Sequence, residues 1–440
     1  MKKNLIFFVM FALFISCGAF AQDDNNETIV ETEVLVEQEY ETAPSTVSSD
    51  EVKGMHLSQY VASSAVLKER FDDLLTNTEL NAVVIDVKEI DGVYCMKGIK
   101  DNVSYSSKIP DFTKYVQQLK EKGVYTIARI VVFRDNNLPR QRPDLAVKTP
   151  EGELWQDYKK ITWLNPYKQE VRDYTLDICD KAVELGFDEI QFDYIRFPSD
   201  GKIKNCRYGV EHSSITASNA IVEFLKQAKQ RLSPKGIKIS IDVFGLTTTE
   251  KGDMGIGQRI VEMTKYVDYV SPMIYPSHYP NGCYGIENPN KEPYRTVYLA
   301  LAGGIKRLPV EKLRPWIQDF SMRGVKYGPE EIKAQIQACF DVDVKTWLLW
   351  NAACRYTKAG LKTKDKQDTY KKSSQEKIDK LLKNKPVDAS INKGWKSASQ
   401  VKKSTSTANK TGVNKAKTAG TGSKAAAPKT AKPAETKNVK

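Results

Sequence analysis

The sequence predicts an α/β protein built on a (β/α)8 TIM barrel, with a hairpin insertion after the third strand and a disordered segment at each end. Eight short β-branched and aromatic runs alternate with helical patterns over most of the chain. Several helical patterns stop at a glycine just before the next strand, as at Gly123, Gly186 and Gly236. A doubly wound open sheet is disfavoured, because no Gly-rich phosphate loop follows the first strand.

The periodicity assigns each element in order. The expected strands are 52–58, 81–88, 124–133, 189–197, 237–245, 267–275, 314–320 and 346–352. The expected helices are 63–77, 111–122, 168–186, 214–232, 255–265, 292–304 and 329–340. The segment 134–166 is too long for an ordinary strand-to-helix connection and is predicted to be the hairpin insertion. It belongs to the C-terminal face of the barrel, where active sites are built.

The composition supports a folded middle with different ends. The chain has 440 residues, of which 40% are hydrophobic and 10% aromatic, which excludes wholesale disorder. The formal net charge is +12, yet residues 393–440 hold twelve Lys against one Glu, and residues 22–51 hold ten acidic residues and no Lys or Arg. The basic charge therefore describes a tail, and no specific nucleic-acid partner is expected.

The N-terminus resembles a secretory signal peptide. Lys2 and Lys3 precede an apolar run over 5–15, and small residues around Ala21 form a cleavage site. We expect an exported protein (periplasmic, cell-surface or secreted), with no transmembrane helix in the mature chain. An uncleaved anchor and a lipoprotein cleaved before Cys17 are the alternatives.

The resulting division has five parts. They are a signal peptide (1–21), an acidic disordered spacer (22–51), the (β/α)8 barrel domain (52–358), a charged helical extension (359–392) and a Lys-rich disordered tail (393–440). The tail is expected either to attach to an anionic cell-envelope polymer or to be a solvated linker.

Cysteine and histidine use argues against a metal site. No CxxC motif is present and only three His occur, so a structural zinc site is not expected. The chemistry expected of the site, described below, needs no metal or organic cofactor. Cys206 and Cys283 fall in loops of one face and form a candidate disulfide pair, whereas Cys179 and Cys339 lie in helical patterns as buried thiols.

Acidic residues recur inside otherwise apolar strands, where an unpaired carboxylate is costly to bury. The catalytic candidates are Asp193 and Asp242, with Asp86 and Asp319 in reserve. Because catalytic groups come from the C-terminal ends of barrel strands, all four are expected at one opening. Close carboxyls raise one another's pKa values and cations lower them. Together these effects can give the protonated acid and the ionised base that glycoside hydrolysis requires.

Cationic and aromatic residues lie near the same strand ends. The substrate-binding candidates are Lys88, Arg129, Tyr194, Arg196, Tyr275, His278 and Trp350. The arginines would orient the carboxylates, and the aromatic residues would stack on sugar rings. Structural alternatives stay open, because a single strand Asp could form an ion pair and Asp86 could simply neutralise Lys88. Trp316 and Trp350 also suit a barrel core, and His56 suits a buried core position.

Five segments together resemble the bacterial putative glycosyl hydrolase domain family. They are 81–88 (NAVVIDVK), 127–131 (IARIV), 186–198 (GFDEIQFDYIRFP), 242–245 (DVFG) and 271–279 (SPMIYPSHY). The resemblance covers about residues 52–355 and implies a (β/α)8 glycosidase fold with acidic strand ends.

Two larger groups of barrels resemble parts of the pattern. In the α-amylase-like superfamily an Asp ending strand 4 is the nucleophile and a Glu ending strand 5 is the acid; Asp193 matches, but position 242 is Asp. Chitinase-like barrels end strand 4 in DxxDxDxE, whereas Tyr194 and Ile195 follow Asp193 here. The signal-like N-terminus, the acidic strand ends and the resemblance together predict an exported glycoside hydrolase that cleaves a polysaccharide by two-carboxylate acid–base catalysis. A non-catalytic glycan-binding or cell-envelope attachment protein is the alternative.

Overall fold

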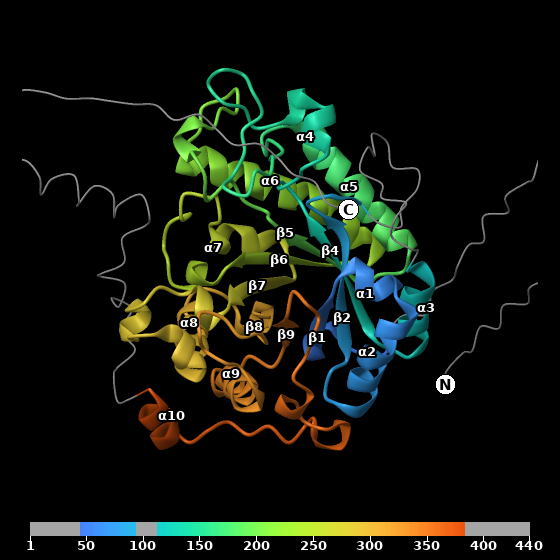
Figure 1. The fold of residues 1–440 in the computed structure, drawn as a ribbon, viewed down its shortest axis with the longest axis vertical. Coiled ribbons are helices and arrows are strands. Elements are labelled where there is room, and N and C mark those ends of the chain that lie inside the picture. The colour runs from blue at the N-terminus through green and yellow to red at the C-terminus, as the bar shows by residue number, and fades with distance from the viewer. Residues whose placement is uncertain (1–44, 94–111, 383–440) are drawn as a thin grey trace, which may run out of the picture. The chain divides into compact units, whose positions relative to one another are not determined.

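The computed structural model describes residues 45–93 and 112–382, and their centre is a closed barrel of parallel strands with helices outside it (Figure 1). The strands are β1 (Lys53–Leu57), β2 (Ala82–Glu89), β4 (Tyr125–Val131), β5 (Glu189–Asp193), β6 (Lys238–Phe244), β7 (Tyr269–Ile274), β8 (Trp316–Gln318) and β9 (Trp347–Trp350). β1 pairs with both β2 and β9, which closes the barrel. A ninth short strand, β3 (Gly92–Val93), pairs antiparallel with β2.

The helices follow the strands along the chain. They are α1 (Gln59–Ser63), α2 (Ala65–Asn77), α3 (Thr113–Glu121), α4 (Leu138–Gln141), α5 (Gln169–Glu184), α6 (Ser214–Leu232), α7 (Ile260–Met263), α8 (Pro293–Gly304), α9 (Pro329–Asp341) and α10 (Gln375–Leu381). Gly123, Gly186 and Gly236 each have a positive φ, so these glycines end the preceding helical segments as expected. The predicted barrel is therefore confirmed.

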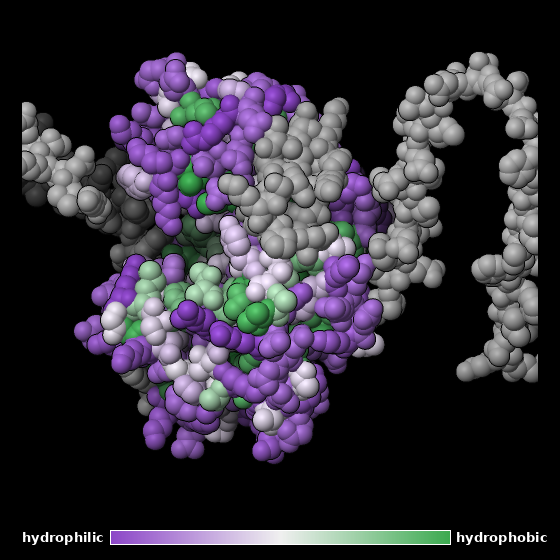
Figure 2. Space-filling view, turned by 45° about the vertical axis from the view of Figure 1, so that its right-hand side comes forward, coloured by the Kyte–Doolittle hydropathy of each residue, from purple (hydrophilic) through white to green (hydrophobic). Residues whose placement is uncertain are grey.

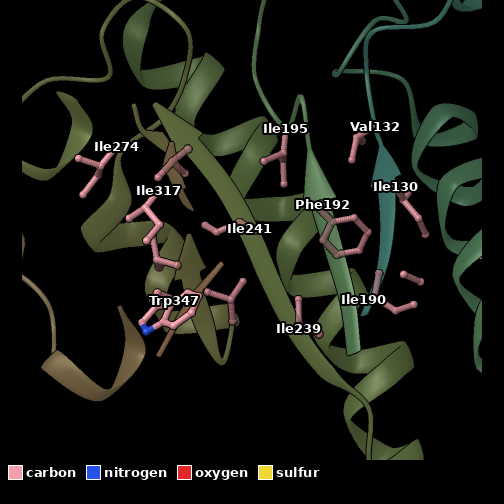
Figure 3. Packing of buried hydrophobic residues seen from close by; sticks show 14 of the residues in the cluster. Ile130, Val132, Ile190, Phe192, Ile195, Ile239, Ile241, Ile274, Ile317 and Trp347 are labelled. Atoms are coloured by element: carbon pink, nitrogen blue, oxygen red, sulfur yellow. The ribbon is translucent and has the colours of Figure 1, made fainter. Parts of the chain in front are cut away.

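Alternating strand residues build two cores, because successive side chains point to opposite faces of a strand. Ile190, Phe192, Ile239 and Ile241 are fully buried in the larger cluster, which also contains the apolar side chains of the helices (Figure 3). The residues between them face the barrel interior. A smaller interior cluster consists of Val52, Ala82, Val84, Tyr125, Ile127, Tyr275, Trp316 and Leu348.

Local differences from the predicted elements have physical causes. The helix expected at 63–77 is split at Ser64, whose hydroxyl caps the Leu67 N–H at the start of α2. The helix expected at 255–265 shrinks to α7, because Gly255 and Gly257 take φ values of +73° and +81°. The strand expected at 189–197 ends at Asp193, where Tyr194 turns the chain with φ +49°.

The segment 134–166 is tied together by isolated antiparallel bridges, in agreement with the predicted hairpin insertion. Arg134 bridges to Trp163, and Lys148 bridges to Leu154. The fully buried rings of Trp155 and Trp163 fix it against the larger core cluster. The insertion follows β4 and so lies at the C-terminal ends of the strands.

The expected Cys206–Cys283 disulfide is not formed, and both residues are buried free thiols. They follow β5 and β7, which β6 separates, so the loops are not neighbours around the barrel. Cys179 and Cys339 are buried helical thiols as predicted.

Beyond the barrel, α10 packs Ile378 and the following Leu382 against the larger core cluster, whereas Leu381 is exposed. Figure 2 shows one face of the molecule, where hydrophilic residues cover most of the described surface and hydrophobic residues form small groups. No helix among the described residues is long and apolar enough to cross a membrane. The predicted signal peptide, acidic spacer (apart from 45–51) and Lys-rich tail lie outside the described residues.

Candidate active site

A cavity of about 390 Å³ opens at the C-terminal ends of the barrel strands. Asp193, Phe244 and Trp350 are the last residues of β5, β6 and β9, and all three line it. The remaining lining residues are Arg129, Tyr194, Arg196, Asp242, Gly245, Leu246, Met273, Tyr275, His278, Tyr279 and Trp316. Eight of the eleven residues proposed from the sequence therefore share this cavity.

Asp193 is held on both carboxylate oxygens. Arg129 donates from Nη2 and Nε to Oδ2 at 2.6 and 3.2 Å, and the backbone N–H of Tyr194 donates to Oδ1 at 2.6 Å. The Asp193 side chain is buried. Two N–H groups of one guanidinium that donate to a carboxylate oxygen stabilise the charged form of the carboxylate and restrict its orientation.

Arg129 connects the cavity with a second acidic layer. Its Nη1 donates to Asp86 Oδ1 at 2.7 Å and also contacts Glu89. The other oxygen of Asp86 lies 2.9 Å from Nε2 of His56. Although burial opposes it, the charge of Asp86 raises the pKa of His56 to about 10, so the imidazole is protonated at neutral pH. His56 and Arg129 hold the pKa of Asp86 below its usual value despite burial.

Asp242 is in the opposite electrostatic state. β5 and β6 pair Phe192 with Ile241, so Asp193 and Asp242 occupy the next matching positions of neighbouring strands. Burial first, and then the nearby charge of Asp193, raise the pKa of Asp242 well above its usual value. Trp316 Nε1 donates a hydrogen bond to Oδ1 of Asp242 at 2.7 Å. The carboxyl of Asp242 is therefore favoured in its neutral, protonated form.

Aromatic rings form one wall of the cavity. The ring centre of Tyr275 lies 5.4 Å from that of His278 and 6.5 Å from that of Trp350. Arg129 lies 5.3 Å from the Trp350 ring centre, which restricts the indole plane. Burial, followed by the charges of Asp242 and Asp193, raises the pKa of the Tyr275 hydroxyl well above its usual value, so the hydroxyl stays a neutral donor.

Three predicted site residues lie outside the cavity lining. Lys88 is fully buried and pairs with Asp135 at 2.9 Å, because a register shift lies between Asp86 and Lys88 on β2. Asp86 reaches the cavity only through Arg129, and it does not pair with Lys88. Asp319 accepts hydrogen bonds from the N–H and the hydroxyl of Thr357 at 2.8 and 2.7 Å, and burial raises its pKa.

Five lining residues were not proposed for the site from the sequence. They are Phe244, Gly245, Leu246, Met273 and Tyr279. Trp316 also lines the cavity, and its position in the sequence suits either an aromatic sugar-binding surface or the barrel core. Strand parity could have identified Phe244 and Met273, since they lie two residues after the inward-facing Asp242 and Ser271. Within 45–93 and 112–382, no three His, Cys, Asp or Glu side chains are arranged to hold a metal ion.

Comparisons with known proteins agree with this architecture. A hypothetical protein from Ruminiclostridium thermocellum is 34% identical, and the match covers 43% of this chain and 97% of that chain with a TM-score of 0.38. The PgaB (BpsB) glycoside hydrolase domain from Bordetella bronchiseptica is 13% identical, with 69% of this chain and 94% of that domain covered and a TM-score of 0.52. At that identity the likeness concerns the fold.

A third structure, the spore cortex-lytic enzyme SleL from Bacillus megaterium, is 13% identical over 70% of this chain and 72% of that chain, with a TM-score of 0.44. The comparison with curated proteins finds no match. A family model described as "Putative glycosyl hydrolase domain" (DUF4015) matches residues 54–356, which span the whole barrel and most of the chain. The chain therefore belongs to this putative glycosyl hydrolase domain family, on a glycoside hydrolase-like TIM barrel.

Proposed function

We propose that the protein is a glycoside hydrolase that cleaves a polysaccharide by two-carboxylate acid–base catalysis. The observation that carries the proposal is the pair of unlike carboxyl groups in one cavity. Arg129 donates hydrogen bonds to the carboxylate of Asp193, whereas burial raises the pKa of Asp242 and so favours its protonated form. Glycoside hydrolysis needs this combination of one acid and one carboxylate. Membership in the family supports a carbohydrate substrate.

The hydrogen bonds assign a role to each group. Asp242 is the general acid that protonates the glycosidic oxygen. Because Trp316 donates to Oδ1 of Asp242, the transferable proton sits on Oδ2. Asp193 is the nucleophile, or the base that activates water, on the other side of the scissile bond. Arg129 is a positioning residue that holds Asp193 in place.

The aromatic wall supplies the sugar subsite. Tyr275 and Trp350 offer roughly parallel ring faces, inclined by 29°, and His278 lies at an exposed position beside them. Ring faces of this kind bury the apolar C–H faces of a pyranose, while the Tyr275 hydroxyl can donate to a sugar oxygen.

The test measures new reducing ends from bacterial exopolysaccharides, peptidoglycan and plant glycans. We expect Asp193→Asn to lower turnover about 10²- to 10⁴-fold, the range for loss of a positioned catalytic group. Asp319→Asn is the matched control, because this buried Asp directly follows β8 and lies outside the cavity lining. Equal losses in both variants would refute the assignment.

A glycan-binding barrel without turnover is the second candidate function. It is favoured by one observation, namely that both oxygens of Asp193 already accept protein hydrogen bonds. If the parent protein and Asp193→Asn both bind one polymer and neither releases sugar, the barrel is a binding module and the hydrolytic mechanism is wrong.

We also propose export and attachment to the cell envelope. The signal-like segment 1–21 and the Lys-rich tail 393–440 support this location. Cell fractionation and N-terminal sequencing test it: we expect a mature chain that begins at Gln22, whereas a chain that begins at Cys17 would indicate a lipoprotein. Removal of 393–440 should abolish salt-sensitive binding to anionic envelope polymers.

A further inference from the structure

Arg196 is a buried cation that lines the cavity. It is 7% exposed. Its guanidinium carbon lies 5.0, 4.9 and 4.8 Å from the ring centres of Trp163, Tyr194 and Phe244. Among the described residues it donates one hydrogen bond, from Nη1 to the backbone oxygen of Phe197 at 3.0 Å. Arginine carries five N–H donors, so most of this guanidinium remains available to a ligand.

Other buried arginines of the described chain have carboxylate partners. Arg129 pairs with Asp86 and Asp193, Arg134 pairs with Asp157, and Arg314 pairs with Glu189. Within 45–93 and 112–382, no ion pair joins Arg196 to an acidic side chain. A buried charge is costly unless it is paired, and aromatic faces compensate only in part. Arg295, also buried, pairs with Glu292, so Arg196 alone among the buried arginines of the described residues lacks a direct acidic partner.

No acidic side chain of the cavity wall pairs directly with this cation, although Asp193 and Asp200 attract it from a greater distance. The direct ion pairs of Asp193, Asp86 and Glu89 are made with Arg129. Burial and then the charge of Asp193 raise the pKa of Asp242 well above its usual value, which disfavours its charged form. The aromatic rings around Arg196 exclude water, which strengthens its attraction for any anion that enters.

A turn in the backbone after β5 directs the Arg196 side chain into the cavity. Tyr194 follows Asp193 with φ +49°, a conformation that costs energy for a bulky residue. The turn buries Ile195 in the larger core cluster and returns the next side chain, Arg196, to the cavity. The strained residue thus brings a carboxylate and a cation, three residues apart, into one wall.

We propose that Arg196 recognises an anionic substituent of the sugar, so that the substrate of this site is an acidic polysaccharide. The inference rests on the proposed function of the same cavity and narrows its substrate class. A carboxylate, such as that of a uronic acid, fits the guanidinium fork in a bidentate pair, and a sulfate ester presents the same charge and acceptor oxygens.

The first experiment needs no mutation. Polygalacturonate, alginate and hyaluronate are each offered beside their carboxyl-reduced forms, and chondroitin sulfate is offered beside its desulfated form. We expect kcat/KM for the anionic form to exceed that for the neutral form by at least about 10-fold, the scale of a buried charge pair. A preference in the carboxylate arm assigns a uronic acid, and one in the sulfate arm assigns a sulfate ester. Equal or faster hydrolysis of neutral polymers would overturn the proposal and leave the hydrolase function intact.

The second experiment assigns any preference to Arg196. Arg196→Gln should reduce the anionic-to-neutral ratio of kcat/KM by about 10-fold or more, and Arg196→Lys should reduce it less, because it keeps the charge and loses the fork. Arg134→Gln is the matched control, since Arg134 lies 5.1 Å from the same Tyr194 ring but pairs with Asp157 and does not line the cavity. It should lower the melting temperature without changing the ratio. An unchanged ratio in Arg196→Gln would refute the role of Arg196.

A binding measurement separates failure of the inference from failure of the proposed function. Asp242→Asn replaces a carboxyl whose charged form is disfavoured by burial with a neutral amide of the same size, so it changes the charge of the cavity little. Calorimetry with galacturonic acid oligomers and their carboxyl-reduced forms should show tighter binding of the charged oligomer to this variant. The difference should disappear in Asp242→Asn/Arg196→Gln. Charge-selective binding by a protein with no turnover would support the inference and refute hydrolysis; no selectivity would refute the inference alone.

Discussion

Two clusters of buried charged residues lie at opposite ends of the same barrel interior. They differ in whether each charged group has a partner within its cluster. At the N-terminal end, Arg314 donates from Nη1 to both oxygens of Glu189 at 2.9 and 2.8 Å, and both side chains are fully buried. The Tyr125 hydroxyl donates to the same carboxylate at 3.0 Å, and the Tyr269 ring centre lies 3.6 Å from Arg314. Each charge has its partner within the cluster.

At the C-terminal end, the same residue types surround an open cavity. Asp193 is matched by Arg129, but Asp242 is neutral and Arg196 has no acidic partner among the described residues. The comparison shows that a charge inside a barrel strand does not by itself indicate function. What distinguishes the two ends is whether every charged group has a direct partner without a ligand.

The largest expected effect is on catalysis at the open end. Asp242→Asn should lower the rate of glycan hydrolysis about 10²- to 10⁴-fold, because an amide cannot donate the proton to the leaving group. The melting temperature should stay equal or rise, since a buried titratable group is removed. Reducing-end release and thermal unfolding measure the two effects. A large loss of stability would mean that Asp242 is structural, like Glu189.

The next effect is on stability at the closed end. Arg314→Met leaves Glu189 buried without its cation and should reduce the free energy of unfolding by about 3–5 kcal/mol. The variant that remains folded should keep its kcat, because Arg314 does not line the cavity. Chemical denaturation and kinetics at low temperature test this. A loss of kcat in fully folded protein would show that the two ends are coupled.

An effect of intermediate size is expected in the pH dependence of stability, which Asp242 at the open end should control. The folded pKa of Asp242 is raised above the unfolded value of about 4. This group therefore contributes stability that is fully present below pH 4 and is lost as the pH rises through the folded pKa. The wild type should lose stability relative to Asp242→Asn as the pH rises, and the hydrolysis rate should fall over the same range. Melting curves from pH 4 to 9 test the sign, and a parallel course of the two proteins would contradict the raised pKa.

The smallest expected effect is on an exposed ion pair, which serves as the reference for the buried charges at both ends of the barrel. Lys181 and Glu184 form an ion pair on α5 at 2.6 Å, with side chains 39% and 59% exposed. Lys181→Ala should change the free energy of unfolding by no more than about 0.5 kcal/mol, because water and salt screen exposed pairs. Denaturant titration measures it. A loss of unfolding free energy comparable with that of Arg314→Met would indicate that burial does not determine how much an ion pair contributes to stability.

Much of the barrel could be predicted because each strand and helix of the repeat carries the same local sequence signals. Strands such as 238–244 combine β-branched residues with a period of two, and Gly236 marks the helix end before it. The same period places Asp242 on the inner face, two residues after Ser240. Asp193 and Asp242 could therefore be assigned to one cavity before any coordinates were known.

The remaining site residues depend on features that a single strand does not carry. Lys88 has the inward parity of Asp86, but the register shift between them turns it to Asp135, a residue 47 positions later. Asp319 finds its partner in Thr357, beyond the last strand. Partners so distant along the chain follow from tertiary packing, which sequence periodicity does not encode.

The closure of β1 against β9 has a consequence for how the molecule is made. Gly54 pairs with Leu348, and the interior position at Gly54 is narrow enough that a Cβ there would lie 2.6 Å from a Leu348 methyl. During synthesis, the first strand can pair with β2 soon after both are made, but its second partner, β9, is made almost 300 residues later. Pairing over such a separation is slow to form. Until residue 350 has emerged, both edges of the growing sheet stay open, and open edges are sites where chains can associate wrongly.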